Sequence, residues 1–472
     1  MKKTLYILLA TLCCSILSFA QDAKESIVLN LYEKPMGIIS FYLQTEGEVS
    51  IEGVDSVQVD EYGKYTCYLG NLGDGDAGPY LVQPLTISAS KIFSLISEAV
   101  YFTTIDLSDC PSLKRLDIKS SLGELNEELD LSAQKDLVYL DCSGGALVQL
   151  NLEHNSKLEV LKCAGNQLTG LSISHLKQLK ELDCSRNKLS QLDVQLLKQL
   201  KELDCSQNQL TELDLTNLDK LESVNAARNN IRSPKLGGLI HLKRLSLAEN
   251  PLGKVLKIDL PELLWLKVSR CGLEKLELVN APNLEGLECS ENKLSSLNLA
   301  NTKIQALDCF LNNIDGTEMG KLIASLPNWN DPKNPGNGKC YAMSYGFSPD
   351  EPDENEKNFA YEDDIKMALD KQWVFMAKTK DGKEVKYAGR PRSTQQIANS
   401  EIVISPNPAT DFVSIQGVSP NTEVRILDLS GKLLIESLAR SEGVLNLDVR
   451  AIPEGNYLVV INGSSQKLAI IR

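Results

Sequence analysis

Two stretches of this chain decide its fold: "LKELDCSRNKL" at residues 179–189 and "LKELDCSQNQL" at residues 200–210. Their cysteines, Cys184 and Cys205, lie 21 residues apart. We call the position of each such cysteine the head of a row and follow it along the chain. The heads are Cys142, Cys163, Cys184, Cys205, Ala226, Leu247, Val268 and Cys289, with Cys309 one residue short; upstream, Ile118 is three residues out of phase and Ser97 lies 21 residues before it.

Leucines recur around each head in the pattern L-x-x-L-x-C-x-x-N-x-L-x-x-L-x-L, and "LEVLKCAGNQLTGLSI" at residues 158–173 is a clean copy. A single row of this kind cannot bury its leucines, whereas about eleven stacked rows form one continuous core. The sequence therefore predicts an α/β-type solenoid of leucine-rich repeats, in which each row adds one short strand to a parallel sheet. The heads Ala226, Leu247 and Val268 are expected to change the local coil.

The head cysteines are expected to point into the core, because cysteine is small, behaves as an apolar residue and is commonly buried. In-register parallel strands are about 4.8 Å apart, farther than the Cβ separation that a disulfide needs. A line of thiols also lacks the tetrahedral arrangement of a zinc site. The predicted structural cysteine ladder comprises Cys142, Cys163, Cys184, Cys205, Cys289 and Cys309.

Asparagines form a second ladder, and a buried asparagine side chain can satisfy backbone groups of its own row and of the next one. Cys271 takes the asparagine position of its row, which is expected to turn differently. His154 and His175 are also 21 residues apart, but without a third ligand we favour a repeated surface position over a metal site. The asparagine ladder comprises Asn166, Asn187, Asn208, Asn229, Asn250, Asn292 and Asn312.

Segments of different composition flank the repeats, which we place at residues 92–315. Residues 21–91 alternate apolar and polar side chains and predict an N-terminal β cap. Asp74 and Asp76 lie in a loop that lacks a bidentate glutamate at calcium-loop spacing, so a plain turn is favoured. Residues 316–389 predict an α+β C-terminal cap, in which the acidic stretch 348–359 is expected to be a mobile loop, and residues 390–401 predict a polar linker.

The two ends of the chain indicate export. Residues 1–20 have the charged start, the apolar run and the small-residue site of a signal peptide, with cleavage expected near Ala20. The net charge of -14 disfavours nucleic acid as a partner. Residues 402–472 predict a separate β-sandwich built from several short strands with Gly and Pro turns.

The motifs in these regions resemble known families. The cysteine-headed rows, over residues 92–314, resemble the repeats of internalin-J-like surface proteins of the Bacteroidota. The motifs "PNPATD", "DLSGK" and "GNY" resemble the C-terminal sorting domain of the type IX (Por) secretion system. This resemblance implies contact with the secretion machinery, removal of the domain, and attachment of the exported protein to surface lipopolysaccharide. The residues that carry it are Pro406, Asn407, Pro408, Asp411, Asp428, Gly431, Lys432, Gly455 and Tyr457.

The residues that alternate with the buried strand leucines are expected to line the concave face of the solenoid. They predict an acidic patch, and a basic patch around an exposed tryptophan, a combination that protein interfaces favour. An alternative is a solvated face on which the tryptophan lies against its neighbours. The candidate partner-binding residues are Arg244, Trp265, Lys267, Arg270, Glu181, Asp183, Glu202, Asp204, Tyr139 and Phe310.

Three classes of function are compatible with an exported repeat protein to different degrees. The signal peptide, the sorting domain and the solenoid favour a surface-displayed binding protein with a protein ligand on a host or bacterial surface, active in attachment or biofilm formation. A glycan-binding or structural surface-layer component is the alternative, although Trp265 is well separated from Tyr139 and Phe310. An enzyme is disfavoured, because no nucleophile elbow, zinc-protease motif or phosphate loop occurs. No cofactor and no metal are expected.

Overall fold

The computed structural model describes residues 24–31, 38–68, 84–98, 102–119, 128–330, 337–344, 355–379, 383–390, 403–418, 422–439, 443–461 and 464–471. The signal peptide, Asp74, Asp76 and the linker residues 391–400 lie outside these ranges. The chain forms two compact units: Met1–Ala360 with Asp364–Ala388, and Tyr361–Asp363 with Gly389–Arg472. None of the helices in the described part has the length and apolar character needed to cross a membrane.

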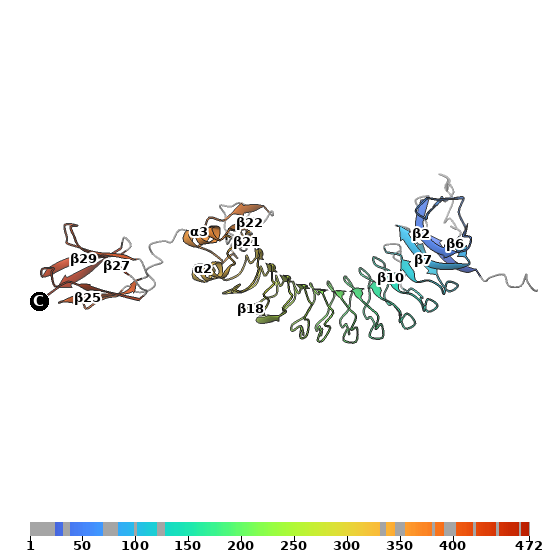
Figure 1. Cartoon of the computed structure of the whole chain (residues 1–472), viewed down its shortest axis with the longest axis horizontal. Coiled ribbons are helices and arrows are strands. Elements are labelled where there is room, and N and C mark those ends of the chain that lie inside the picture. The colour runs from blue at the N-terminus through green and yellow to red at the C-terminus, as the bar shows by residue number, and fades with distance from the viewer. Residues whose placement is uncertain are drawn as a thin grey trace, which may run out of the picture. The chain divides into compact units, whose positions relative to one another are not determined.

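Short parallel strands follow one another along the solenoid and line its inner side (Figure 1). Residues at equivalent positions pair directly, so that Leu182 lies opposite Leu161 on one side and Leu203 on the other. The predicted leucine-rich repeat solenoid is therefore confirmed. Its strands are β9 (Arg115–Asp117), β10 (Tyr139–Asp141), β11 (Val160–Lys162), β12 (Glu181–Asp183), β13 (Glu202–Asp204), β14 (Ser223–Asn225), β15 (Arg244–Ser246), β17 (Trp265–Lys267), β19 (Gly286–Glu288) and β20 (Ala306–Asp308).

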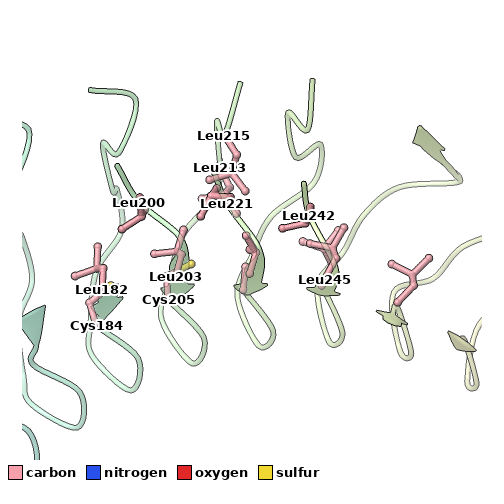
Figure 2. Packing of buried hydrophobic residues seen from close by; sticks show 14 of the residues in the cluster. Leu182, Cys184, Leu200, Leu203, Cys205, Leu213, Leu215, Leu221, Leu242 and Leu245 are labelled. Atoms are coloured by element: carbon pink, nitrogen blue, oxygen red, sulfur yellow. The ribbon is translucent and has the colours of Figure 1, made fainter. Parts of the chain in front are cut away.

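The coil core is made of leucines and head residues. Figure 2 shows Leu182, Cys184, Leu203 and Cys205 directed between the stacked coils. Cys184 and Cys205 are fully buried, and Leu182 is 1% exposed. Each fully buried leucine contributes about 1.5–3 kcal/mol of hydrophobic free energy, and the stacking of rows repeats this contribution along the solenoid.

The rows headed by Ala226, Leu247 and Val268 keep the strand register of their neighbours. The expected change of coil is therefore absent from the concave strands. It occurs elsewhere in the same rows, where β16 (Val255–Asp259) and β18 (Lys275–Asn280) form an additional two-stranded parallel sheet. All three heads are fully buried, so side chains of different volume occupy the same interior position.

A left-handed residue follows each head from Cys142 to Cys309 by two positions. Outside glycine, this backbone conformation costs about 1–2 kcal/mol per residue. It turns the chain sharply out of the strand, and the ladder asparagine comes directly after it in most rows. The residues are Gly144, Gly165, Arg186, Gln207, Arg228, Glu249, Arg270, Glu291 and Leu311, with φ between 52° and 75°.

The N-terminal cap continues the solenoid sheet. Strands β4, β5, β2 and β7 are hydrogen-bonded in that order, and β7 pairs in parallel with β9, with Ser94 opposite Arg115. The domain boundary expected between residues 91 and 92 falls inside β7. The cap strands are β1 (Glu25–Leu31), β2 (Ile38–Glu46), β3 (Ser50–Glu52), β4 (Ser56–Val59), β5 (Lys64–Tyr68), β6 (Leu85–Ala89), β7 (Lys91–Glu98) and β8 (Phe102–Asp106), and β3-β6-β1-β8 form a second sheet.

The C-terminal cap extends the opposite edge of the sheet. β21 (Gly338–Ser344) and β22 (Trp373–Lys378) add two parallel strands after β20, and β23 (Glu384–Lys386) pairs antiparallel with β22. The helical part of this α+β cap consists of α2 (Gly316–Ser325) and α3 (Glu362–Asp370). The Asp315 side chain caps α2 by accepting the backbone N–H groups of Thr317 and Glu318.

The second unit contains a β-sandwich with its own core. Strands β24-β25-β28 form one sheet and β27-β26-β29-β30 the other. Fully buried side chains such as Val413, Ile426 and Val459 fill the space between them. The strands are β24 (Val403–Ser405), β25 (Phe412–Val418), β26 (Glu423–Leu427), β27 (Leu433–Leu438), β28 (Gly443–Asp448), β29 (Gly455–Ile461) and β30 (Ser464–Ile470).

Candidate functional site

The concave face consists of the strand residues that flank each buried leucine. One column precedes the leucines and includes Glu181, Arg244 and Trp265; the other follows them and includes Asp183 and Lys267. Because the strands are in register, the members of a column lie about 4.8 Å apart from row to row. The chemistry of this face therefore follows from the order of residues at 21-residue spacing.

Trp265 forms a flat aromatic surface on the concave face. In the next row stands Gly286, and a Cβ atom placed there would lie only 2.1 Å from Cε3 of Trp265. The indole ring thus rests against the backbone of Gly286, and the absence of a side chain makes this contact possible. Trp265 remains 40% exposed. It lies against its neighbour, as the alternative interpretation expects, and still presents a large apolar area to solvent.

The cationic residues expected around Trp265 all have partners. Arg244 donates from Nε to Ser223 Oγ (3.2 Å), and its Nη2 lies 3.8 Å from Glu202 Oε1. Lys267 pairs with Glu288 at 3.0 Å. Arg270 is the left-handed residue of its row and pairs with Glu291 at 2.8 Å, so it belongs to the turn that follows the strand rather than to the strand.

The predicted acidic patch is partly neutralised within the solenoid. Glu181 pairs with Lys162 at 2.7 Å. Asp183 and Asp204 each accept the backbone N–H two residues ahead, at 3.0 Å and 2.9 Å. These two aspartates therefore help to form the turn that leaves each strand, a structural role that sequence analysis did not assign.

The remaining two candidates occupy opposite ends of the concave face. The Arg115 guanidinium lies 3.5 Å from the ring centroid of Tyr139. Lys378 Nζ lies 5.4 Å from the ring centroid of Phe310 and 4.2 Å from that of Tyr341. Phe310 thus contacts the C-terminal cap and Tyr139 contacts the preceding row, so the ten candidates do not form one cluster.

Lys378 and Tyr341 are site residues that sequence analysis missed. Lys378 also pairs with Asp308 at 3.0 Å. Burial raises the pKa of Asp308, and the neighbouring Lys378 acts in the opposite direction. Tyr341 and Lys378 come from β21 and β22, which lie outside the 21-residue repeat, so the repeat pattern contains no signal for them.

The cysteine ladder is buried along its whole length. Cys142, Cys163, Cys184 and Cys205 are fully buried, as are Cys289 and Cys309. Burial raises the pKa of the Cys163 and Cys184 thiols well above the ordinary value, so these thiols are neutral and unreactive. The cysteines in the described part of the chain are free thiols.

The asparagine ladder connects backbone groups of successive rows. The Asn208 Nδ2 atom donates to the carbonyl oxygens of Cys184, Cys205 and Ser206, at 3.0, 3.1 and 3.3 Å. Its Oδ1 accepts the N–H of Leu189 at 3.0 Å. Equivalent bonds are made by Asn166, Asn187, Asn229, Asn250, Asn292 and Asn312.

Cys271 takes the place of one asparagine of the ladder, and its row turns differently, as expected. Its Sγ reaches the carbonyl oxygens of Leu247 and Ser269 at 3.3 and 3.4 Å. A thiol offers no amide oxygen for the next donor, so the N–H of Leu252 bonds to the Asn250 carbonyl instead. The additional strand β16 begins three residues later, at Val255.

Asn358, from the C-terminal cap, extends the asparagine ladder by one further residue. Its Nδ2 donates to Cys309 O at 2.8 Å and to Ala342 O at 3.0 Å, and its Oδ1 accepts the N–H of Ile314 at 2.9 Å. Asn358 is fully buried. The interpretation of residues 348–359 as a mobile loop is therefore wrong for residues 355–359, which dock on the last row.

The two histidines occupy different environments. His154 is exposed, whereas a ring nitrogen of His175 lies 2.9 Å from Leu152 O. Within the described residues, no group of three or more His, Cys, Asp or Glu side chains has an arrangement suited to a metal ion.

The sorting-motif residues hold the sandwich together. Asn407 Nδ2 donates to Lys467 O at 2.8 Å, and Asn407 Oδ1 accepts the N–H of Ala469 at 2.9 Å. Asp428 accepts the N–H groups of Ser430 and Lys432 across the turn at Gly431, which has φ of 86°. The Tyr457 hydroxyl donates to Pro453 O at 2.7 Å.

Two family models match the chain. Residues 156–196 match leucine-rich repeats (two copies), and residues 403–471 match a secretion system C-terminal sorting domain. The chain is therefore a leucine-rich repeat protein that carries a type IX (Por) sorting domain. The sorting domain implies export with association to the cell surface or outer membrane, and contact with the type IX machinery. No curated protein sequence matches the chain.

Several solved structures are similar to this chain. The functional domain of InlJ from Listeria monocytogenes, described as including a cysteine ladder, is 20% identical, with 80% of this chain and 81% of that chain covered and a TM-score of 0.45. An internalin (inlF) from Listeria monocytogenes is 16% identical, covering 61% and 80%, with a TM-score of 0.39. YopM from Yersinia enterocolitica is 26% identical, covering 50% and 53%, with a TM-score of 0.37.

Proposed function

We propose that this protein is an exported, surface-attached binding protein that recognises a protein partner on a host or bacterial surface through its concave face. It acts in attachment or biofilm formation. Its signal peptide is removed near Ala20, and its sorting domain is removed when the protein is attached to surface lipopolysaccharide. The role is binding rather than catalysis, and it needs no cofactor.

The exposed indole of Trp265 is the observation that carries this proposal. A tryptophan that rests on Gly286 loses little side-chain freedom when a partner covers its outer face. Arg244, in the preceding row, supplies a neighbouring cation whose pairing with Glu202 is long, at 3.8 Å. An aromatic anchor beside an arginine is the composition that binding hot spots favour.

A glycan ligand for the concave face is less well supported. Sugar sites place several exposed aromatic side chains close together. Strands β11, β12, β13, β14 and β15 separate Tyr139 from Trp265, and Gly286 and Ala306 stand between Trp265 and the cap residue Lys339 in the same column. Trp265 is thus an isolated aromatic residue on this part of the face.

The test is adhesion and biofilm formation by cells that display either the wild type or the Trp265→Ala/Arg244→Glu variant. Surface amounts are matched with an antibody against the solenoid. Truncating a central anchor typically costs about 2 kcal/mol or more of binding free energy, so adhesion is expected to fall by at least about tenfold.

The matched control is Val279→Ala/Arg232→Glu, which removes an apolar side chain that is 63% exposed and reverses an exposed arginine, both away from the concave strands. Its adhesion is expected to equal that of the wild type. Equal adhesion of all three displayed proteins would refute the assignment of the site to the concave face. Unchanged adhesion after deletion of the whole gene would refute the adhesin proposal itself.

A further inference from the structure

A cluster of lysines lies on the side of the solenoid that leads into the concave strands. We call residues 177–180, 198–201, 219–222 and 240–243 the ascending flank. Its backbone is stacked in register: Lys201 N–H donates to Lys180 O (2.8 Å), Glu222 N–H to Lys201 O (2.8 Å) and Lys243 N–H to Glu222 O (2.9 Å). The lysines of this flank are Lys177, Lys180, Lys198, Lys201, Lys220 and Lys243.

Most of these lysines have no carboxylate partner. Of the six, Lys180 pairs with Glu159 at 2.6 Å and Lys243 with Glu222 at 3.0 Å. The Lys220 ammonium donates only to the Gln199 amide oxygen, at 2.6 Å. Across the described residues, no salt bridge neutralises the four remaining side chains, which are exposed: Lys177, Lys198, Lys201 and Lys220.

Several other lysines of the solenoid are neutralised by a glutamate or aspartate of the same row or an adjacent row. Within the described residues Lys114, Lys135, Lys188, Lys293 and Lys303 make no salt bridge either, so the flank differs in gathering four such lysines on three successive rows. The paired lysines are Lys157, with Asp136 (2.5 Å), Lys162, with Glu181 (2.7 Å), Lys235, with Asp214 (2.8 Å), Lys254, with Glu274 (3.0 Å), Lys257, with Glu277 (3.3 Å), Lys267, with Glu288 (3.0 Å), and Lys275, with Glu277 (2.6 Å).

The flank also contains a hollow of about 340 Å³, lined by Lys201, Lys220, Glu222, His241, Lys243 and Glu262. Both carboxylates already have partners, since Glu222 pairs with Lys243 and Glu262 lies 3.3 Å from His241. Three lysines and two glutamates line the hollow, so with His241 neutral it carries one net positive charge, which suits a sulfate or carboxylate group.

We propose that the ascending flank binds an acidic polysaccharide, a linear chain that carries sulfate or uronate groups. The unpaired ammonium groups belong to three successive rows, so they span about 10 Å across the coils, which calls for a chain with several charges rather than a single anion. The glutamates Glu181 and Glu202 on the adjacent concave face repel such a chain and confine it to the flank. This site is independent of the protein-binding surface around Trp265.

A nucleic acid fits the same flank less well. No Phe, Tyr or Trp occurs between Tyr139 and Trp265, so none of these rings is available on the flank for bases to stack on. The absence of these rings also disfavours a neutral glycan, because the flank provides mainly charge.

The experiment measures fluorescence anisotropy of labelled oligomers with the purified full chain at low salt. The probes are dextran sulfate, an oligouronate, unsulfated dextran and a short DNA duplex. Binding of dextran sulfate or the oligouronate, weakened by added salt, is expected, with no binding of dextran. The first two probes distinguish sulfate from carboxylate recognition.

The variant K198Q/K201Q/K220Q is compared with K235Q/K254Q/K257Q, which removes the same charge from lysines that are neutralised by carboxylates. Because released counterions dominate such binding, the flank variant is expected to lose about tenfold or more in affinity. The control is expected to stay within about twofold. Equal loss in both variants, no binding by the wild type, or DNA binding as tight as that of the acidic polysaccharide would each overturn the proposal.

Discussion

At the scale of single residues, each row combines one unfavourable backbone conformation with one asparagine side chain whose hydrogen bonds are favourable. A left-handed residue turns the chain out of each strand, and the asparagine that comes next binds the carbonyl groups that the turn exposes. At Asn229 the amide donates at 3.0, 3.2 and 3.3 Å to Cys205, Ala226 and Ala227, and accepts the Leu210 N–H at 2.9 Å. The asparagine thus offsets the strain of its own turn.

Replacing Asn229 with alanine is expected to lower the free energy of unfolding by about 2–4 kcal/mol, because buried carbonyl groups and one N–H lose their partner. Urea denaturation measures the change. The control is Asn230→Ala, whose side chain is exposed and whose described hydrogen bond is made by its backbone N–H. It should change stability by less than about 0.5 kcal/mol. Similar losses for the two variants would contradict the role of the ladder.

The buried thiols predict a loss of stability in alkali. Burial raises the pKa of Cys67 and of Cys271 to about 11, and raises that of Cys184 well above the ordinary value. An unfolded thiol has a pKa of about 8.5. Above that value the unfolded chain loses protons that the folded chain keeps, so the stabilisation is complete below about pH 8.5 and declines as the pH rises towards 11.

The urea concentration at the unfolding midpoint, measured from pH 7 to pH 10.5, should therefore decrease once the pH exceeds about 8.5. Relative to its own midpoint at pH 7, a Cys184→Ala variant should show a smaller decrease. Iodoacetamide at pH 8 gives an independent measurement. The native protein should remain unlabelled at the ladder cysteines, while the urea-unfolded protein is labelled at all of them. Labelling of native Cys184 at the unfolded rate would contradict its burial.

At the scale of elements, the C-terminal cap is joined to the last row by one asparagine from outside the repeat. Asn358→Ala removes the bonds to Cys309, Ala342 and Ile314. Hydrogen exchange at Ile314 and in β21 should accelerate, because the cap segment then detaches more often. The control is Asn313→Ala, an exposed neighbour whose side chain makes one bond, to Lys293 O at 3.4 Å. Equal protection in the two variants would count against Asn358 as the connecting residue.

The repeat elements could be predicted because their contacts recur at a fixed spacing in the sequence. Leu182 meets Leu203 in the same way that Leu203 meets Val224, so one row defines the next. The left-handed positions were not predictable, because residues such as Arg186 and Glu249 carry no sign of that conformation.

The candidate site was predictable only as columns of residues. Position in the repeat places Trp265 and Arg244 on one face, but it does not reveal that the ring rests on Gly286. Contacts between the solenoid and its cap, such as Lys378 with Phe310, depend on how separate elements dock. The lysines of the ascending flank stand out only once the carboxylate partners of the other lysines are known.

At the scale of the whole molecule, the described residues form two separate hydrophobic cores. One extends from Ile27 in the N-terminal cap through the solenoid to Tyr387. The other, which includes Val413 and Ile470, lies entirely within the sorting domain. Separate cores predict separate unfolding, because each is built from the buried side chains of its own unit.

A chain truncated after residue 390 should therefore keep the thermal transition of the solenoid unchanged to within about 1–2 °C and lose a second, smaller transition. Differential scanning calorimetry of the full and truncated chains measures both. The matched variant is Val413→Ala in the full chain, which leaves a cavity in the sandwich core and should lower only the smaller transition. A solenoid transition that falls by many degrees on truncation would mean that the sorting domain stabilises the repeats. That result would argue against the proposed removal of this domain from the mature surface protein.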